Sequence, residues 1–205
     1  MNFDLRKTIE QIKSNKNFLK LRDVVENNAY HDNEPVFDHL IKTYGIAVRE
    51  INANFITNKE AKEKFDQYTN GEVKGIKKKD LMLILALIHD IGKTVKFEKL
   101  DNGSTNAKGH EYEGSLIVPD FVEGLPKEVT DYLSTGVRLH GVFNDSWNKN
   151  KNASPPDLFN IVKQQSEGIG VELVFNSYCD CFTAKPFQPA IPLIHQIFNE
   201  RKIYT

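Results

Sequence analysis

The sequence predicts an all-α protein, with residues 1–205 forming a single domain of roughly eight to ten helices. Apolar residues recur at intervals of three and four along most of the chain, which is the period of an amphipathic helix. No stretch keeps the alternation of a β-strand for more than a few residues. A chain of 205 residues is long enough to bury a substantial core.

The clearest single element is a run of eight apolar residues from Leu81 to Ile88, with Asp80 as the expected N-cap. A helix that is apolar all round belongs inside a globule, and this one leads directly into His89 and Asp90. An unpaired buried charge is costly, so a divalent metal is an economical partner for this pair. The simpler alternative leaves Asp90 exposed at the helix end and His89 as an ordinary core histidine.

Composition narrows the possible partners. Lysine plus arginine (27) nearly balances aspartate plus glutamate (28), so the charge gives no strong nucleic-acid signal. No apolar run reaches the roughly 18 residues of a membrane span, so no membrane partner is expected. The first residues lack the apolar core of a signal peptide, and two cysteines are too few for a disulfide framework. A cytoplasmic location is therefore expected.

The other helices are expected between polar stretches. Their ranges are about 36–54, 58–68, 109–124, 126–140, 155–165, 168–184 and a last helix ending near 202. Residues 3–27 show two short helical patterns without visible chemistry. The polar stretches 27–34, 99–108 and 144–154 are expected to be surface loops. His31, in the first of them, could reach the rim of a pocket, but a surface position is the simpler interpretation.

Two more residues could complete a metal site with His89 and Asp90. His39 lies on the smaller, weakly apolar face of its helix, which suits close approach to another helix. Asp180 projects among small and apolar neighbours and also requires a cationic partner. Two imidazoles and two carboxylates suit Mn, Fe, Co, Ni or Zn, whereas Mg is tolerated less well.

Other reactive side chains have plainer interpretations. His140 continues a buried stripe, where a lone histidine is usually structural. His195 is most simply a packing residue. Cys179 and Cys181 face apart on their helix, so neither is expected to be a ligand.

The histidines and aspartates nevertheless occur in a characteristic order. The series is His39, the pair His89-Asp90, His110, His140 and Asp180. Its local settings are Leu-Ile-His-Asp-Ile-Gly-Lys, Gly-His-Glu-Tyr-Glu-Gly and Leu-His-Gly. In this order and in helical context, the series resembles the HD-domain superfamily of metal-dependent phosphohydrolases.

The resemblance covers about residues 36–184 and implies an HD-type helical bundle there, with 1–35 and 185–205 as helical extensions. It implies one metal ion held by four residues, His39, His89, Asp90 and Asp180. In related proteins the histidines that match His110 and His140 contact substrate phosphate or help to hold a second metal. Lys93 matches the lysine of the His-Asp-x-x-Lys form, which contacts phosphate.

The sequence differs from two subgroups of this superfamily, and these differences bear on which substrate is expected. Members that act as 5′-deoxynucleotidases have Glu at the position of Lys93. Cyclic-dinucleotide phosphodiesterases have a His-His pair and a Gly-Tyr-Pro motif, whereas His140 is followed by Gly141. The motif form is most similar to the HD domains attached to tRNA nucleotidyltransferases, which hydrolyse phosphate esters.

The expected function is therefore a metal-dependent phosphohydrolase that cleaves a mono- or diester of a nucleotide or similar small molecule by a metal-activated water. Its expected catalytic residues are Asp90, Lys93, His110 and His140. The cofactor is a divalent ion (Mn, Co, Ni, Fe, Zn or Mg), with a second ion conceivable at His110 and His140. Two alternatives stay open: a non-catalytic metal- or nucleotide-binding module, and an HD-fold di-iron oxygenase. The oligomeric state is left open, and loops 98–109 and 142–154 are expected to shape the substrate pocket.

Overall fold

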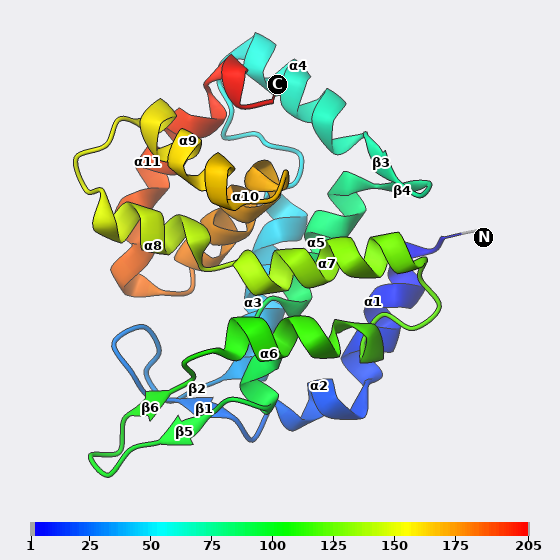
Figure 1. The fold of residues 1–205 in the computed structure, drawn as a ribbon, viewed down its shortest axis with the longest axis vertical. Coiled ribbons are helices and arrows are strands. Elements are labelled where there is room, and N and C mark those ends of the chain that lie inside the picture. Colours follow the sequence, from blue (N-terminus) through cyan, green and yellow to red (C-terminus); the bar gives the residue numbers. More distant parts are fainter. Residues whose placement is uncertain (1–2, 205) are drawn as a thin grey trace.

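Helix α5 (Lys78–Ile88) runs through the middle of the protein (Figure 1). The structure, a computed structural model, describes residues 3–204. All eight residues from Leu81 to Ile88 are buried, which confirms the burial predicted for this segment. Helices α3 (Val36–Glu50), α7 (Lys127–Leu139) and α10 (Gly170–Cys181) pack against α5.

The other α-helices of the described residues surround these four. They are α1 (Leu5–Ser14), α2 (Lys16–Lys20), α4 (Lys59–Thr69), α6 (His110–Ile117), α8 (Val142–Lys149), α9 (Pro155–Gln165) and α11 (Ile191–Phe198). Four 3-10 helices are η1 (Ile91–Thr94), η2 (Val118–Asp120), η3 (Lys185–Ala190) and η4 (Arg201–Tyr204). The strands form three antiparallel pairs of two residues each: β1 (Val25–Glu26) with β2 (Glu34–Pro35), β3 (Glu72–Val73) with β4 (Ile76–Lys77), and β5 (Glu98–Lys99) with β6 (Thr105–Asn106). The predicted all-α class is confirmed.

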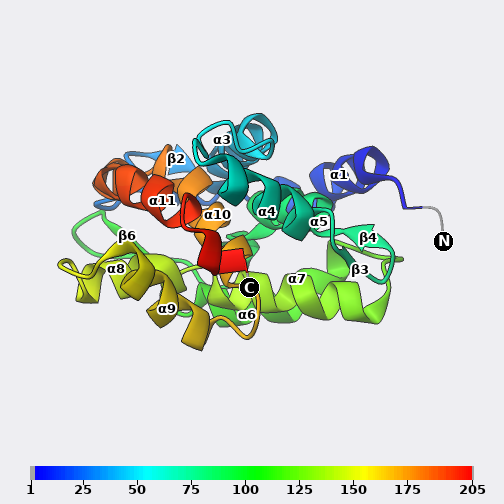
Figure 2. The same ribbon diagram turned by 90° about the horizontal axis from the view of Figure 1, so that it is seen from above.

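The helices form two layers when the protein is seen from above (Figure 2). Helices α6, α7, α8 and α9 lie along one side, and α1, α3, α4 and α11 lie along the other. Helices α5 and α10 run between the layers, which explains why their residues are buried almost throughout. The C-terminal end of α5, which leads into His89 and Asp90, therefore lies between the two layers.

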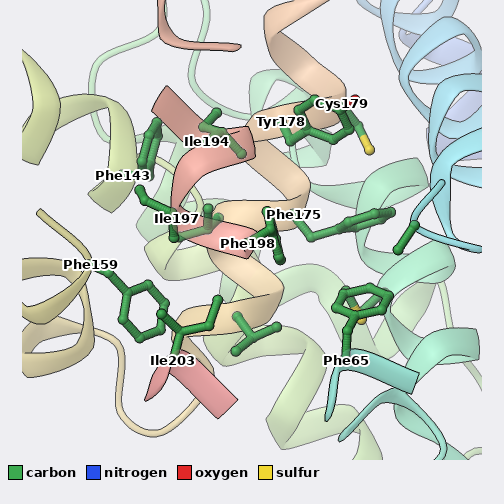
Figure 3. Close-up of a cluster of buried hydrophobic side chains, with 14 of the residues drawn as sticks. Phe65, Phe143, Phe159, Phe175, Tyr178, Cys179, Ile194, Ile197, Phe198 and Ile203 are labelled. Atoms are coloured by element: carbon green, nitrogen blue, oxygen red, sulfur yellow. The ribbon is translucent and has the colours of Figure 1, made fainter. Parts of the chain in front are cut away.

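Two clusters of buried apolar side chains fill the interior. One gathers aromatic residues of α4, α8, α9, α10 and α11, including Phe65, Phe175 and Phe198 (Figure 3). The rings of Phe65 and Phe198 meet edge to face, with centroids 5.7 Å apart. The second cluster joins α1, α2, α5 and α7 around Leu81 and Leu133.

A buried carboxylate connects four of the helices. Glu172 of α10 is 1% exposed and accepts hydrogen bonds from the hydroxyl groups of Tyr68 in α4 and Tyr132 in α7. The ammonium group of Lys78, at the start of α5, lies 3.4 Å from the same carboxylate. Because each partner comes from a different helix, this network helps to set the positions of α4, α5, α7 and α10 around the core.

The structure corrects the prediction that residues 144–154 form a loop, because helix α8 covers Val142–Lys149. Phe143 and Ser146 are buried, and Trp147 packs against the aromatic cluster. These residues are three and four apart, so they share one face of the helix, while Asp145, Asn148 and Lys149 are exposed. Because the segment is rich in polar residues, its short amphipathic pattern was not recognised in the sequence.

The start of α5 also differs from its prediction. The helix begins at Lys78, directly after the β3–β4 pair, and Lys77 occupies the N-cap position without a side-chain hydrogen bond. Asp80 therefore lies in the first turn of the helix, where a carboxylate still interacts favourably with the helix dipole.

The predicted surface loop at residues 27–34 is the most consequential correction. The β1–β2 pair folds this segment back on itself, and the side chain of Asn28 accepts hydrogen bonds from the backbone N–H groups of Tyr30 and His31. His31 is consequently only 8% exposed, not a surface residue. The expected helical extension 1–35 therefore ends in a strand pair, the β1–β2 hairpin (residues 25–35), that reaches the interior.

None of the helices between residues 3 and 204 combines the length and the apolar character needed to cross a membrane.

Helix α6 and the 3-10 helix η1 approach each other unusually closely at Gly92 and Gly114. A Cβ atom added to Gly92 would lie 1.9 Å from the backbone oxygen of His110 and 2.6 Å from the backbone nitrogen of Gly114. Only glycine can occupy position 92 without moving α6, and this contact holds His110 close to the end of α5.

Replacing Gly92 with alanine is expected to lower the free energy of unfolding by about 3 kcal/mol or more, because backbone atoms cannot yield as a side chain would. Gly45→Ala is the matched control: no atom lies within 4 Å of the added Cβ, and alanine should stabilise α3 by about 0.5–1 kcal/mol. Urea denaturation of both variants measures the two changes. Equal stability of Gly92→Ala and the unmodified protein would contradict the close contact.

Candidate metal centre

The carboxylate of Asp90 lies between two pairs of histidines. Asp90 follows His89 at the C-terminal end of α5 and is 4% exposed. Its Oδ2 atom lies 3.5 Å from Nε2 of His39 and 3.5 Å from Nε2 of His89. Its Oδ1 atom lies 2.8 Å from Nε2 of His110 and 3.3 Å from Nε2 of His140. One side chain thus faces nitrogen atoms from four different segments.

The first group contains the four residues predicted as metal ligands. Nε2 of His39 lies 3.2 Å from Oδ1 of Asp180 and 3.3 Å from Nε2 of His89. Nε2 of His89 lies 3.9 Å from the same Asp180 oxygen. Atoms that each bind one ion at about 2.1 Å are about 3–4 Å from one another, so these separations fit a single cation. The structure brings together residues 141 positions apart in sequence, His39 and Asp180.

A second group lies on the other side of Asp90. Asp90, His110 and His140 each offer an atom within 4.8 Å of the other two, and the Nε2 atoms of the two histidines are 3.3 Å apart. The chemistry of this set, two imidazoles and one carboxylate, also fits a divalent cation. The arrangement could therefore hold one ion on each side of Asp90.

Three of the four histidines are oriented by their own backbone neighbourhood. Nδ1 of His89 donates to the carbonyl of Ala86, at 3.1 Å, and Nδ1 of His140 donates to the carbonyl of Val137, at 2.7 Å. Both acceptors are among the last four carbonyls of a helix, which lack intrahelical partners. Nδ1 of His110 likewise faces a carbonyl three residues earlier, at 2.8 Å. With the proton on Nδ1, each neutral ring offers its Nε2 lone pair to the centre.

The charge state of the centre suits a cation. Burial lowers the pKa of His89 to about 4, so this ring is neutral and able to bind a metal at physiological pH. Burial alone would raise the pKa values of Asp90 and Asp180, but neighbouring cationic and histidine groups hold both well below the ordinary value. The two carboxylates are consequently charged.

Lys93 occupies the turn after Asp90 and is buried between two carboxylates. Its Nζ atom donates to Oδ2 of Asp90 at 2.7 Å and to Oε2 of Glu26 at 2.8 Å. Burial would lower its pKa, but these carboxylates raise it above the ordinary value. Lys93 lines the pocket, although two of the three N–H groups of its ammonium are already used. Its contact with a substrate phosphate stays a prediction.

The centre opens into a cavity of about 350 Å³. Both segments expected to shape it contribute side chains: Asn106 and Lys108 from one, and Asn144, Asp145 and Asn148 from the other, now seen as helix α8. Tyr30 and Phe187 also line this cavity, with their rings stacked nearly parallel and centroids 4.9 Å apart. Amide groups and exposed aromatic faces of this kind suit a small polar ligand with a planar part.

Three residues near the centre lie on the β1–β2 hairpin: Glu26, His31 and Glu34. The two glutamates were not predicted, and His31 lines the pocket, which was the less favoured of its two interpretations. Their only sequence signal was a histidine between two glutamates ahead of the helix that carries His39, and a polar loop explained that pattern equally well.

The remaining reactive side chains lie outside the two ligand groups. The contacts of His195 lie outside the centre: its Nε2 atom is 3.0 Å from the hydroxyl of Tyr178, and its ring stacks on Phe55. Cys179 and Cys181 are buried free thiols, and neither belongs to a metal-compatible group among the described residues.

A scan against protein-family models and a search of curated proteins found no match for this chain. The assignment of a function therefore depends on the geometry of the centre.

The unmodified protein is expected to bind Mn²⁺ or Co²⁺, whereas Asp180→Asn should bind markedly less tightly because the amide lacks the carboxylate charge. The asparagine is isosteric, so the fold should be retained. Isothermal titration calorimetry on metal-free protein measures the affinity. His195→Ala is the control and should bind like the unmodified protein; equal affinity of Asp180→Asn would contradict the ligand assignment.

Proposed function

We propose that this protein is a metal-dependent phosphohydrolase that cleaves a phosphate ester of a nucleotide or similar small molecule. The observation that carries the proposal is the position of the Asp90 carboxylate, which faces two pairs of histidines at the base of an accessible cavity. The resemblance of the same residues to the HD-domain series supports it.

In this proposal His39, His89, Asp90 and Asp180 hold the primary cation, because their ligand atoms are spaced as one ion requires. A divalent ion there would lower the pKa of a water molecule and polarise a phosphoryl oxygen of the substrate.

Other residues of the chain would stabilise the charge on the phosphoryl group and transfer protons. His110 and His140 direct their Nε2 atoms toward the cavity side of Asp90, where a protonated ring can donate a hydrogen bond to a phosphoryl oxygen or a proton to the leaving oxygen. The third N–H of Lys93 and the ammonium of Lys108, which also lines the cavity, would add positive charge.

The shape of the cavity supports a small substrate. A volume of about 350 Å³ is at the lower end of the range for small-molecule sites. The stacked rings of Tyr30 and Phe187 offer an aromatic face, and Asn144 and Asn148 offer amide donors and acceptors. A nucleoside with one phosphate group matches this lining.

Metal-loaded protein is expected to release phosphate or nucleoside from a panel of nucleoside monophosphates, 2′,3′-cyclic phosphates and para-nitrophenyl phosphate. The panel is run with Mn²⁺, Co²⁺, Ni²⁺ and Mg²⁺ in turn, with and without chelator. Asp90→Asn should lose this activity, because both histidine groups share the Asp90 carboxylate. Turnover of Asp90→Asn equal to that of the unmodified protein would falsify the catalytic assignment.

His110→Ala is expected to lower kcat by about 10²–10⁴-fold, the usual contribution of a general acid. Because His110 lies outside the first ligand group, the primary metal ion should remain bound. Steady-state kinetics and metal analysis of the same sample separate the two effects. A variant with unchanged kcat and unchanged metal content would remove His110 from the mechanism.

One observation also favours a second candidate, a di-iron oxygenase: the two oxygens of Asp90 face separate ligand groups, as a bridge between two irons requires. Protein loaded anaerobically with Fe²⁺ would then contain two irons per chain and consume oxygen with an added substrate. Tight nucleotide binding without product under any of these conditions would instead indicate a non-catalytic module.

A further inference from the structure

His39 differs from the other three histidines of the centre in one respect. The Nδ1 atoms of His89, His110 and His140 each have a backbone carbonyl partner, whereas Nδ1 of His39 is buried and has no hydrogen-bond partner in the described chain. His39 is 1% exposed. A buried polar atom without a hydrogen-bond partner typically costs about 1–3 kcal/mol, so the surroundings of this nitrogen require an explanation.

The position of His39 in its helix explains why no carbonyl is available. His89 and His140 follow the last residue of a helix, where carbonyls are free, but His39 lies inside α3. Carbonyls in that part of α3 accept the intrahelical N–H groups. The Nδ1 side of His39 must therefore find an acceptor outside its own helix.

The β1–β2 hairpin brings a candidate acceptor, the Glu34 carboxylate, close to His39. His39, His31 and Glu34 each offer a nitrogen or carboxylate oxygen within 4.8 Å of the other two, and the rings of His31 and His39 meet edge to face with centroids 4.7 Å apart. The Glu34 carboxylate is held on both sides: Oε2 lies 2.9 Å from Nδ1 of His31, and Oε1 accepts from Lys42 at 2.6 Å.

The same hairpin also connects to the Asp90 carboxylate through a chain of polar contacts. Nε2 of His31 lies 3.6 Å from Oε2 of Glu26, the same oxygen accepts from Lys93 at 2.8 Å, and Lys93 donates to Asp90 at 2.7 Å. Glu34 is thus the far end of a continuous network that begins at the shared carboxylate of the centre.

We propose that Glu34 is the positioning residue of His39: in the metal-loaded protein its carboxylate accepts the Nδ1 proton of His39 and directs Nε2 at the ion. This inference depends on the metal centre of the proposed function. A histidine that binds a metal through one nitrogen characteristically donates the other N–H to a carboxylate or carbonyl. Loss of that acceptor typically weakens metal binding about 10–100-fold. The hydrogen bond that Nδ1 of His31 donates to Oε2 holds the carboxylate in place, whereas Lys42 is an exposed partner on its outer side.

The test uses the full chain loaded with Zn²⁺, which is diamagnetic. In the unmodified protein, the Nδ1 proton of His39 should appear as a downfield imidazole signal protected from exchange, identified by its absence in His39→Gln. Glu34→Ala should lose this signal and bind Zn²⁺ and Co²⁺ about 10–100-fold more weakly. Glu34→Gln, which retains an acceptor oxygen, should recover part of both properties.

Lys42→Met is the matched control, because it removes the same ion pair but leaves the Glu34 carboxylate beside His31 and His39. It should keep the signal and most of the affinity. Glu34→Ala with an unchanged signal and affinity would overturn the positioning role alone. A loss of one whole metal equivalent in Glu34→Ala would overturn it in favour of direct ligation. Failure of the unmodified protein to bind any of these metals would overturn both this inference and the proposed function.

Discussion

A charged carboxylate buried directly beyond the apolar segment 81–88 of helix α5 is the constraint around which this protein is arranged. Helix α5 carries Asp90 into the interior, where solvation by water is lost. The ammonium of Lys93 and the histidine nitrogens around Asp90 replace that solvation. The helices that meet the end of α5 must therefore bring polar side chains to one point.

The histidines reach this point by two different means. His89 and His140 use carbonyls left free at the ends of their own helices, so their orientation is a local property of helix termination. His39 lies within a helix, and the acceptor proposed for its Nδ1 is on the hairpin that directly precedes that helix. Orientation at a helix end requires only the right residue there, whereas orientation by Glu34 also requires that the β1–β2 pair form and place this carboxylate beside α3.

Because the Asp90 carboxylate faces two histidine pairs, the centre is compatible with either one bound ion or two. A single ion with His39, His89, Asp90 and Asp180 leaves His110 and His140 free for proton transfer, while two ions would use all six side chains as ligands. Under the proposed function, one bound ion would leave His110 as the general acid, and two bound ions would make His110 a ligand. The small cavity beside the centre is compatible with either arrangement.

The sequence by itself determined the all-α class, the burial of residues 81–88 and the identity of the four residues expected to converge, because helical periodicity and the cost of buried charge are local properties. Two polar stretches were wrongly predicted to be surface loops: helix α8 and the hairpin that carries His31. A short amphipathic element and a loop contain similar residues, so composition did not distinguish them. Only the tertiary structure decided that each oxygen of Asp90 faces a different histidine pair and that Glu34 lies beside His39. Periodicity specifies which face a side chain occupies, but the partner of that face depends on how helices distant in sequence cross.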